Sequence, residues 1–226
     1  MLHATPLNKK ETHQSWEEPE SQPKPQTKDV IISNSELALL RERVTLLEAE
    51  VSILRQDLDS ERQQANIDHL TGIPNRRAYQ TRLLEERARC KRENKQLCLI
   101  IWDIDHFKSI NDQFGHWIGD RVITCIANKI SQRLRLSDFI ARIGGEEFAT
   151  LLPDCGKESA QQLAEQIRQE VAQCYIELET EIVKATISCG IAELAPNESD
   201  ASLFTRADKA LYQAKSAGRN RICSAP

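Results

Sequence analysis

The 226-residue chain has a net charge of −4 and a pI near 5.8, so it lacks the basic footprint expected of a nucleic-acid-binding protein. Its longest apolar run, residues 97–102, is far too short to span a membrane, and the N-terminus lacks the apolar core of a signal peptide. The seven cysteines form no C-x-x-C pair, and their odd number argues against a disulfide framework. We therefore expect a soluble cytoplasmic protein with reduced thiols.

Residues 1–34 hold four of the eight prolines together with many Gln, Glu, Lys and Thr residues. Such a segment has too little apolar surface to offset the entropy lost on ordering. The composition predicts a disordered leader.

An uninterrupted apolar repeat follows the leader, with spacings of three and four and no Gly or Pro inside it. Leu or Val at the first heptad position with Leu at the fourth favours a parallel, two-stranded coiled coil over residues 35–66. The alternative is an amphipathic helix that packs on its own domain. The repeat consists of Leu37, Leu40, Val44, Leu47, Val51, Leu54 and Leu58.

Residues 67–226 read as one globular domain in which helical and strand patterns alternate. The patterns predict helices at about 75–94, 120–134, 157–174 and 203–217, the last closed by Gly218. Strands are predicted at 97–102, on both sides of residues 144–145, and within 183–192. The expected fold class is α/β (α+β), with one central, partly antiparallel sheet.

The pentapeptide from Gly144 to Phe148 reads Gly-Gly-Glu-Glu-Phe and lies between two short apolar stretches. Gly-Gly is typical of a two-residue hairpin turn, because glycine accepts positive φ at both central positions. Two acids directly after such a turn indicate a site where the backbone approaches a ligand. A plain acidic hairpin is the alternative.

Two carboxylates, Asp103 and Asp105, end the apolar strand and are expected on the same side of its pleat. Carboxylates at a strand end suit Mg²⁺, which takes one or two of them together with substrate phosphates. They could instead be solvated acids that merely end a strand. Glu146 in the neighbouring hairpin favours the metal site, because acids from two adjacent strands could converge.

Other polar residues near these acids match the parts of a nucleotide. Lys108 offers a point charge for phosphate, and Asn111 and Asp120 could read a purine edge. Lys215 and Arg219, four residues apart, could approach the same phosphates. Their alternative role is to place cations favourably at a helix C-terminus.

Taken together, four blocks resemble the diguanylate cyclase (GGDEF) family, in order and at family spacing over residues 68–222. The first reads DHLTGIPNRR (68–77), and the second begins DIDHFK at 103 and continues with ND, GH and GD up to 120. The third reads ARIGGEEF (141–148), and the fourth joins ADKALYQAK (207–215) to GRN (218–220). Four ordered blocks are a specific signal.

The resemblance implies a fold like the palm of nucleotidyl cyclases and polymerases. It implies condensation of two GTP into cyclic di-GMP with release of pyrophosphate, using Mg²⁺, with Mn²⁺ as an alternative. By the same resemblance, Asp103, the main-chain carbonyl of Ile104 and Glu146 hold the metal, and Glu146 also accepts the proton of the attacking hydroxyl. The implied substrate-binding residues are Phe107, Lys108, Asn111, His116, Asp120, Gly144, Gly145, Lys215 and Arg219.

Since one copy holds one GTP, the reaction requires a homodimer, which the coiled coil would supply. Arg135 and Asp138 lie just before the Gly-Gly-Glu-Glu-Phe motif and resemble the family's inhibitory product site. In isolation they would be a surface ion pair. A second arginine often completes that site, and here Gln166 occupies the expected place. No nucleic-acid or membrane partner is expected.

Three rival interpretations stay open. The domain could bind cyclic di-GMP or GTP without making product, although no motif carboxylate or glycine is lost. It could make a mixed purine dinucleotide, against which Asp120 argues because its carboxylate suits guanine. The coil could also be an interaction scaffold that carries a silent domain.

Overall fold

The computed structural model describes residues 34–178 and 181–226. The predicted leader lies outside these residues, except for Asn34. Contacts within the chain divide it into two units, one ending at Ile53 and the other comprising Leu54–Pro226. Among the described residues, none of the helices pairs the length with the apolar character that a membrane span requires.

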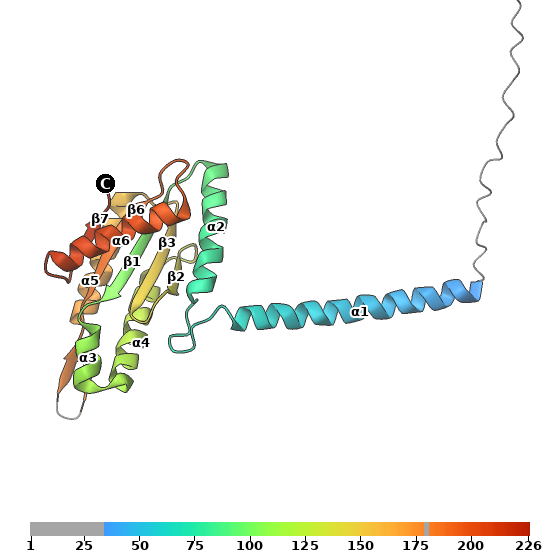
Figure 1. The fold of residues 1–226 in the computed structure, drawn as a ribbon, viewed down its shortest axis with the longest axis horizontal. Coiled ribbons are helices and arrows are strands. Elements are labelled where there is room, and N and C mark those ends of the chain that lie inside the picture. Colours follow the sequence, from blue (N-terminus) through green and yellow to red (C-terminus); the bar gives the residue numbers. More distant parts are fainter. Residues whose placement is uncertain (1–33, 179–180) are drawn as a thin grey trace, which may run out of the picture. The chain divides into compact units, whose positions relative to one another are not determined.

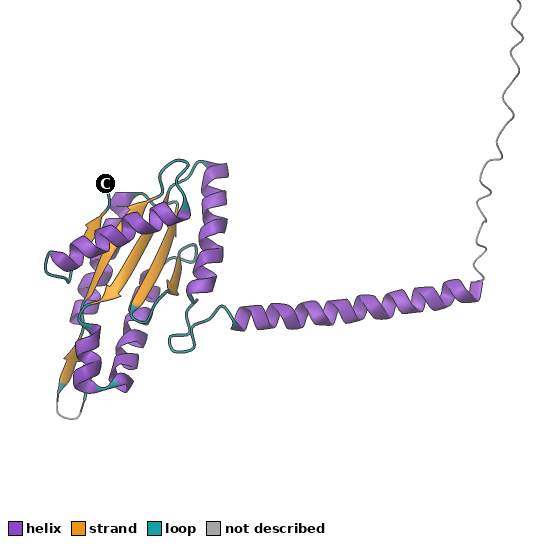
Figure 2. Cartoon of the chain, in the orientation of Figure 1, coloured by secondary structure: helices purple, strands orange, loops and turns teal. Residues whose placement is uncertain are grey.

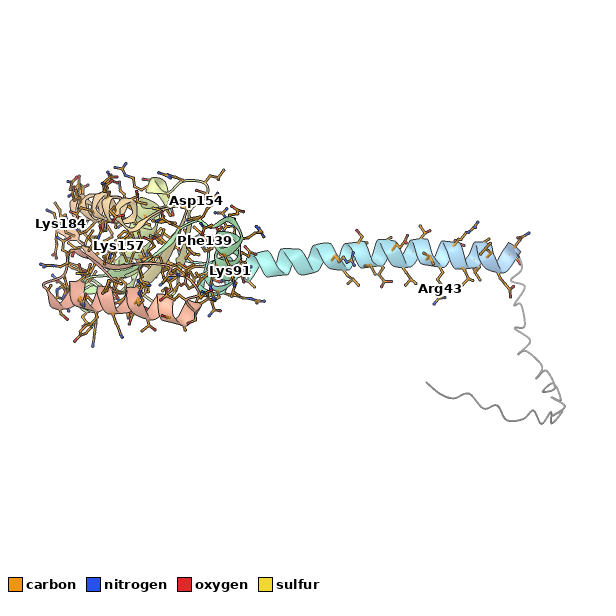
Figure 3. All side chains as sticks on the ribbon, turned by 90° about the horizontal axis from the view of Figure 1, so that it is seen from above. Arg43, Lys91, Phe139, Asp154, Lys157 and Lys184 are labelled. Carbon is orange, nitrogen blue, oxygen red and sulfur yellow. The ribbon has the colours of Figure 1, made fainter. Side chains whose placement is uncertain are left out.

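The predicted heptad segment is a continuous helix, α1 (Asn34–Gln64). Its side chains stand out all around the helix, as at Arg43 in Figure 3. Leu58 lies outside the part of α1 whose side chains are described. The other six heptad residues are 38–59% exposed: Leu37, Leu40, Val44, Leu47, Val51 and Leu54. The helix is thus confirmed, and its apolar stripe is exposed.

The second unit is built on a five-stranded sheet in the order β2-β3-β1-β6-β7 (Figure 2). Every neighbouring pair is antiparallel except β6 and β7, which run parallel. This confirms the expected mixed fold with a mostly antiparallel sheet. The strands are β1 (Leu97–Ile104), β2 (Phe139–Arg142), β3 (Glu147–Pro153), β6 (Ile187–Glu193) and β7 (Ile222–Ser224).

Helices cover both faces of this sheet, which explains why β1 is apolar at nearly every position (Figure 1). Leu97, Leu99 and Ile101 pack in one core with helices α2 and α6. The alternating residues Cys98 and Ile100 point into the other core, with helices α3, α4 and α5. The helices are α2 (Arg76–Glu93), α3 (Phe107–Phe114), α4 (His116–Arg133), α5 (Lys157–Gln173) and α6 (Asp200–Ser216).

A separate hairpin pairs β4 (Tyr175–Glu177) with β5 (Ile182–Lys184). Its inner residues, Ile176 and Val183, are buried in the core that contains α4. The hairpin therefore belongs to the α3–α5 side of the sheet.

The helix predicted at about 120–134 begins earlier, at His116, and α3 was not predicted at all. Gly115, with φ 81°, separates the two helices. Gly119 lies inside α4. The helices predicted at 75–94 and 157–174 match α2 and α5, while α6 starts three residues early, behind the N-cap Ser199.

Candidate active site

The end of β1 and the acidic turn lie side by side, as the sequence predicted. Asp103 is in register with Glu147, and the Ile104 amide donates to the Glu146 carbonyl at 3.2 Å. Burial, and then the negative charge of Asp103, raise the pKa of the Glu146 carboxyl above its ordinary value. Asp103 and Glu146 therefore form one electrostatic group.

The turn itself differs from the prediction. Four residues, not two, connect β2 to β3, and the Ile143 and Gly144 amides both donate to the Glu147 carbonyl. Neither Gly144 nor Gly145 has a positive φ, so the predicted two-residue turn with left-handed glycines is wrong. A Cβ on Gly145 would meet nothing within 4 Å, whereas one on Gly144 would press against the Glu147 carboxylate. Open space at Gly145 fits a backbone that a ligand approaches.

A half-buried ion pair between Arg142 and Asp68 braces this turn. The Arg142 guanidinium donates to the Gly145 carbonyl at 2.6 Å and to both carboxylate oxygens of Asp68 at 3.1 Å. Burial alone would raise the pKa of Asp68, but hydrogen bonds from Thr71 and Arg142 lower it below its ordinary value. The first motif block thus helps to position the third, a role that the sequence did not predict.

The two aspartates at the end of β1 have different roles. Asp105 accepts hydrogen bonds from Thr186 Oγ1 and Ser188 Oγ at 2.7 Å and from the Asn220 amide at 2.9 Å. These bonds occupy its carboxylate and tie three segments together. Asp103 instead forms one ion pair, with Lys215 Nζ at 2.7 Å. Asp103 is therefore the aspartate that a ligand can recruit.

Burial raises the pKa of Asp103, and the Lys215 ammonium offsets this only in part. Within the part of the chain that the structure describes, no three His, Cys, Asp or Glu side chains gather into a metal-binding cluster. Two carboxylates and the Ile104 carbonyl nevertheless suit Mg²⁺, which completes its shell with substrate oxygens. A cation would also relieve the repulsion between Asp103 and Glu146, so these residues fit the implied metal.

The phosphate-binding candidates come from two helix ends. Lys215 reaches Asp103 because α6 lies close on β6, where Gly190 faces its backbone; a Cβ there would overlap Ala207 and Leu211. Arg219 follows in the left-handed conformation, with φ 61°. On the other side, Lys108 is exposed in the first turn of α3, just after the buried Phe107.

The guanine-reading candidates lie where α3 meets α4. Asn111 Oδ1 is buried and has no hydrogen-bond partner, so it is an acceptor that awaits a donor. Gly119 makes room for it, because a Cβ at that position would collide with the Asn111 side chain. His116 and Asp120 are exposed and share one face of α4, four residues apart. The structure thus brings Asn111 and the start of α4 together.

Arg135 and Asp138 border a separate cavity of about 240 Å³, which Arg133 and Gln166 also line. The Asp138 carboxylate accepts from the Arg135 main-chain amide at 2.8 Å, so this turn is fixed by a backbone contact. Arg168, the nearest arginine on α5, instead pairs with Glu165 and Asn220. Gln166, which the sequence led us to expect in place of a second arginine, lines the cavity.

Comparison with known proteins agrees with these motifs. The family model described as "Diguanylate cyclase, GGDEF domain" matches residues 65–221. Diguanylate cyclase DgcP of Pseudomonas aeruginosa is 46% identical over 186 residues, which make up 82% of this chain but only 28% of DgcP. The chain thus spans well under two thirds of this curated relative.

Solved structures extend the comparison to the fold. The coiled coil and GGDEF domain of DgcB from Caulobacter crescentus, in complex with c-di-GMP, matches with a TM-score of 0.74 and 37% identity, over 82% of this chain and 99% of that one. The active GGEEF domain of a Vibrio cholerae diguanylate cyclase matches with a TM-score of 0.64 and 39% identity, over 67% and 97%. Since the family model covers more than half of the chain, this protein belongs to the GGDEF family of diguanylate cyclases.

Proposed function

We propose that the chain is a diguanylate cyclase that condenses two GTP into cyclic di-GMP and two pyrophosphates. The observation that carries the proposal is the convergence of Asp103, Glu146 and Lys215 at the end of β1. This places two carboxylates and a cation where two phosphate-bearing substrates could meet. The active GGEEF domain from Vibrio cholerae supports Glu at the third position of the motif.

The residues around this centre hold one GTP. The buried Asn111 Oδ1 accepts from the guanine edge, and Asp120 and His116 complete the base site. Lys108, Arg219 and the Phe107 main chain hold the β- and γ-phosphates, which pass close to Gly144 and Gly145. Lys215 leaves Asp103 for the phosphates when the substrate binds.

A divalent cation, Mg²⁺ or alternatively Mn²⁺, held by Asp103, Glu146 and the Ile104 carbonyl supplies charge neutralisation at the phosphates. The 3′-hydroxyl of one GTP attacks the α-phosphorus of the other, and the bond to pyrophosphate breaks. Glu146 accepts the hydroxyl proton as general base. Lys215 and Arg219 stabilise the charge on the departing pyrophosphate.

The second GTP comes from a second copy of the chain. Residues 35–66 form the dimerising coil, and residues 67–226 form the catalytic domain. The exposed apolar stripe of α1 supports this arrangement, as does the coiled coil in the DgcB structure. Attachment through α1 raises the local concentration of one catalytic domain near the other.

Product binds at Arg135 and Asp138 and slows the enzyme. The cavity beside these residues supports this role, and so does the c-di-GMP in the DgcB complex. Removing a charged hydrogen-bonding side chain costs about 1.5–3 kcal/mol of binding. We therefore expect Arg135→Ala to raise the half-inhibitory concentration of cyclic di-GMP at least tenfold, and an unchanged curve would refute the feedback site.

The direct test is incubation of the full chain with GTP and Mg²⁺, followed by chromatography of the products. Cyclic di-GMP and pyrophosphate should appear in a 1:2 ratio. GTP binding without product would establish a binding module instead. A mixed dinucleotide, formed only when ATP is added, would establish the alternative substrate class.

A further inference from the structure

An exposed tryptophan stands beside the proposed guanine site. Trp117 follows His116 in the first turn of α4, and its side chain is 69% exposed. The Arg121 guanidinium lies 5.1 Å from the centroid of the indole ring, a cation–π contact that holds the ring on the surface. By contrast, Trp102 is fully buried and donates to Thr150. Among the described residues, Trp117 belongs to neither hydrophobic core.

Arg121 links this tryptophan to the β4–β5 hairpin. Arg121, Tyr175 and Glu177 line one shared opening. Tyr175 and Ile182 are 54% and 57% exposed, and Ile182 lies directly opposite Glu177 in the ladder. We call Trp117, Arg121, Tyr175, Glu177 and Ile182 the Trp117 patch.

The composition of the Trp117 patch is that of a protein interface. Trp, Tyr and Arg are the residues most enriched among those that dominate binding energy. Apolar side chains gathered on a surface, with charges among them, mark interaction sites more often than chance exposure. Arg121 and Glu177 also give the patch both signs of charge, so that Arg121 of one copy can pair with Glu177 of the other.

We propose that the Trp117 patch is where the catalytic domain of a second copy docks when two GTP-loaded sites meet. The inference rests on the proposed function, because that reaction requires two sites to face each other. Trp117 follows His116 in the first turn of α4, so the patch begins on the helix face next to the one that carries His116 and Asp120. Two sites that meet about a two-fold axis would bring these neighbouring faces close to each other. In this arrangement α1 keeps the copies together, and the patch orients them.

Kinetics of the full chain with Trp117→Ala test the proposal. We expect kcat to fall about tenfold at saturating GTP, while affinity for a non-hydrolysable GTP analogue stays within twofold of wild type. Trp117→Phe should keep most of the rate because it preserves an aromatic contact. The matched control is Leu84→Ala, which removes a 59% exposed side chain from α2, on the opposite face of the sheet, and should change neither quantity. An unchanged kcat, or a loss of analogue affinity equal to the loss of rate, would overturn the proposal.

A second measurement needs no turnover. In a Trp16→Phe background, acrylamide quenches only Trp117 appreciably, since Trp102 is buried. The GTP analogue with Mg²⁺ should lower the quenching constant at least twofold. Leu47→Asp places a charge among the apolar heptad residues of the proposed coiled coil, which we call the coil seam. This substitution should abolish the protection at low protein concentration. Protection that persists in Leu47→Asp would assign Trp117 to its own nucleotide and overturn the proposal. If wild type makes no product but Trp117 is still protected, the docking surface stands and the proposed function fails.

Discussion

Helices α1 and α4 carry the same kind of apolar stripe, but its surroundings differ completely. In α4, Ile118, Val122 and Ile126 are buried against the sheet. In α1, the equivalent stripe, including Val44 and Leu47, is exposed. Periodicity predicts that an apolar face exists, and it does not say which part of which chain covers it.

The difference separates two properties of the protein. The helices of the second unit pack against partners within the chain, and the proposed chemistry resides in residues 67–226. Encounter between two sites depends on α1, where the partner is another copy under the proposed function. Changes to the domain should therefore act at every protein concentration, and changes to α1 only when the protein is dilute.

The largest effect should come from Glu146→Gln. Removing the proposed general base and metal ligand should lower kcat by about 10²–10⁴-fold, equally at low and high protein concentration. Pyrophosphate release measures the rate. The control is Glu147→Gln, because the Glu147 carboxylate lies against Gly144 in the turn. If Glu147→Gln abolishes activity and Glu146→Gln does not, the roles of the two acids are reversed.

The two apolar stripes can be compared directly by shortening one side chain in each to alanine. Ile126→Ala in α4 should cost about 2–5 kcal/mol of unfolding free energy, because it leaves a cavity in a packed core. Val44→Ala in α1 should leave the unfolding of the catalytic domain unchanged, because its side chain is exposed. Chemical denaturation monitored by the fluorescence of the buried Trp102 distinguishes the two variants. Equal destabilisation would show that α1 is part of the domain's core.

Disruption of the coil seam should have a smaller, conditional effect. Leu47→Asp places a charge at the predicted seam and should lower specific activity about tenfold in dilute protein, with recovery as protein is concentrated. Leu46→Asp is the matched control, since Leu46 is the adjacent exposed leucine outside the seam. A loss in Leu47→Asp that does not depend on concentration would place α1 in the chemistry, and not in assembly.

The parts of the fold that the sequence predicted are those with a strong local pattern. The strand at Leu97 and the helix at Lys157 combine unbroken apolar periodicity with clear ends. Helix α3 was missed because it is only eight residues long and coincides with the motif residues, although Phe107, Ile110 and Phe114 recur at helical spacing. The start of α4 was placed too late because Gly119, which the sequence does not mark as helical, lies inside the helix and makes space for Asn111.

In the candidate site, the resemblance identified the motif residues, but it did not identify the residues that hold them in place. Asp68 and Arg142 are 74 positions apart, and Asp105 bonds to Thr186 and Ser188 across a still longer interval. No periodicity links such residues. The Gly-Gly turn was misassigned because glycine is found both where φ is positive and where space is needed, and the sequence does not distinguish the two.

The smallest predicted effect concerns stability and pH, and it separates the two aspartates at the end of β1. Burial raises the pKa of folded Asp103 above its ordinary value of 3.8, so the folded state holds this proton more tightly than the unfolded state does. Protonated Asp103 therefore makes its full contribution to stability below pH 3.8, and this contribution is lost as the pH rises through the pKa of the folded state.

It follows that Asp103→Asn should raise the melting temperature by about 2–4 °C at pH 7 in metal-free buffer, if the relieved penalty is about 1 kcal/mol. The gain should shrink as the pH is lowered towards 4. Asp105→Asn should have the opposite sign, because Asp105 accepts three hydrogen bonds and the amide cannot accept them all. Scanning calorimetry between pH 4 and 7 tests both variants. A lower melting temperature for Asp103→Asn at pH 7 would mean that the ion pair with Lys215 outweighs the cost of burial, so that Lys215 anchors Asp103 in the absence of substrate.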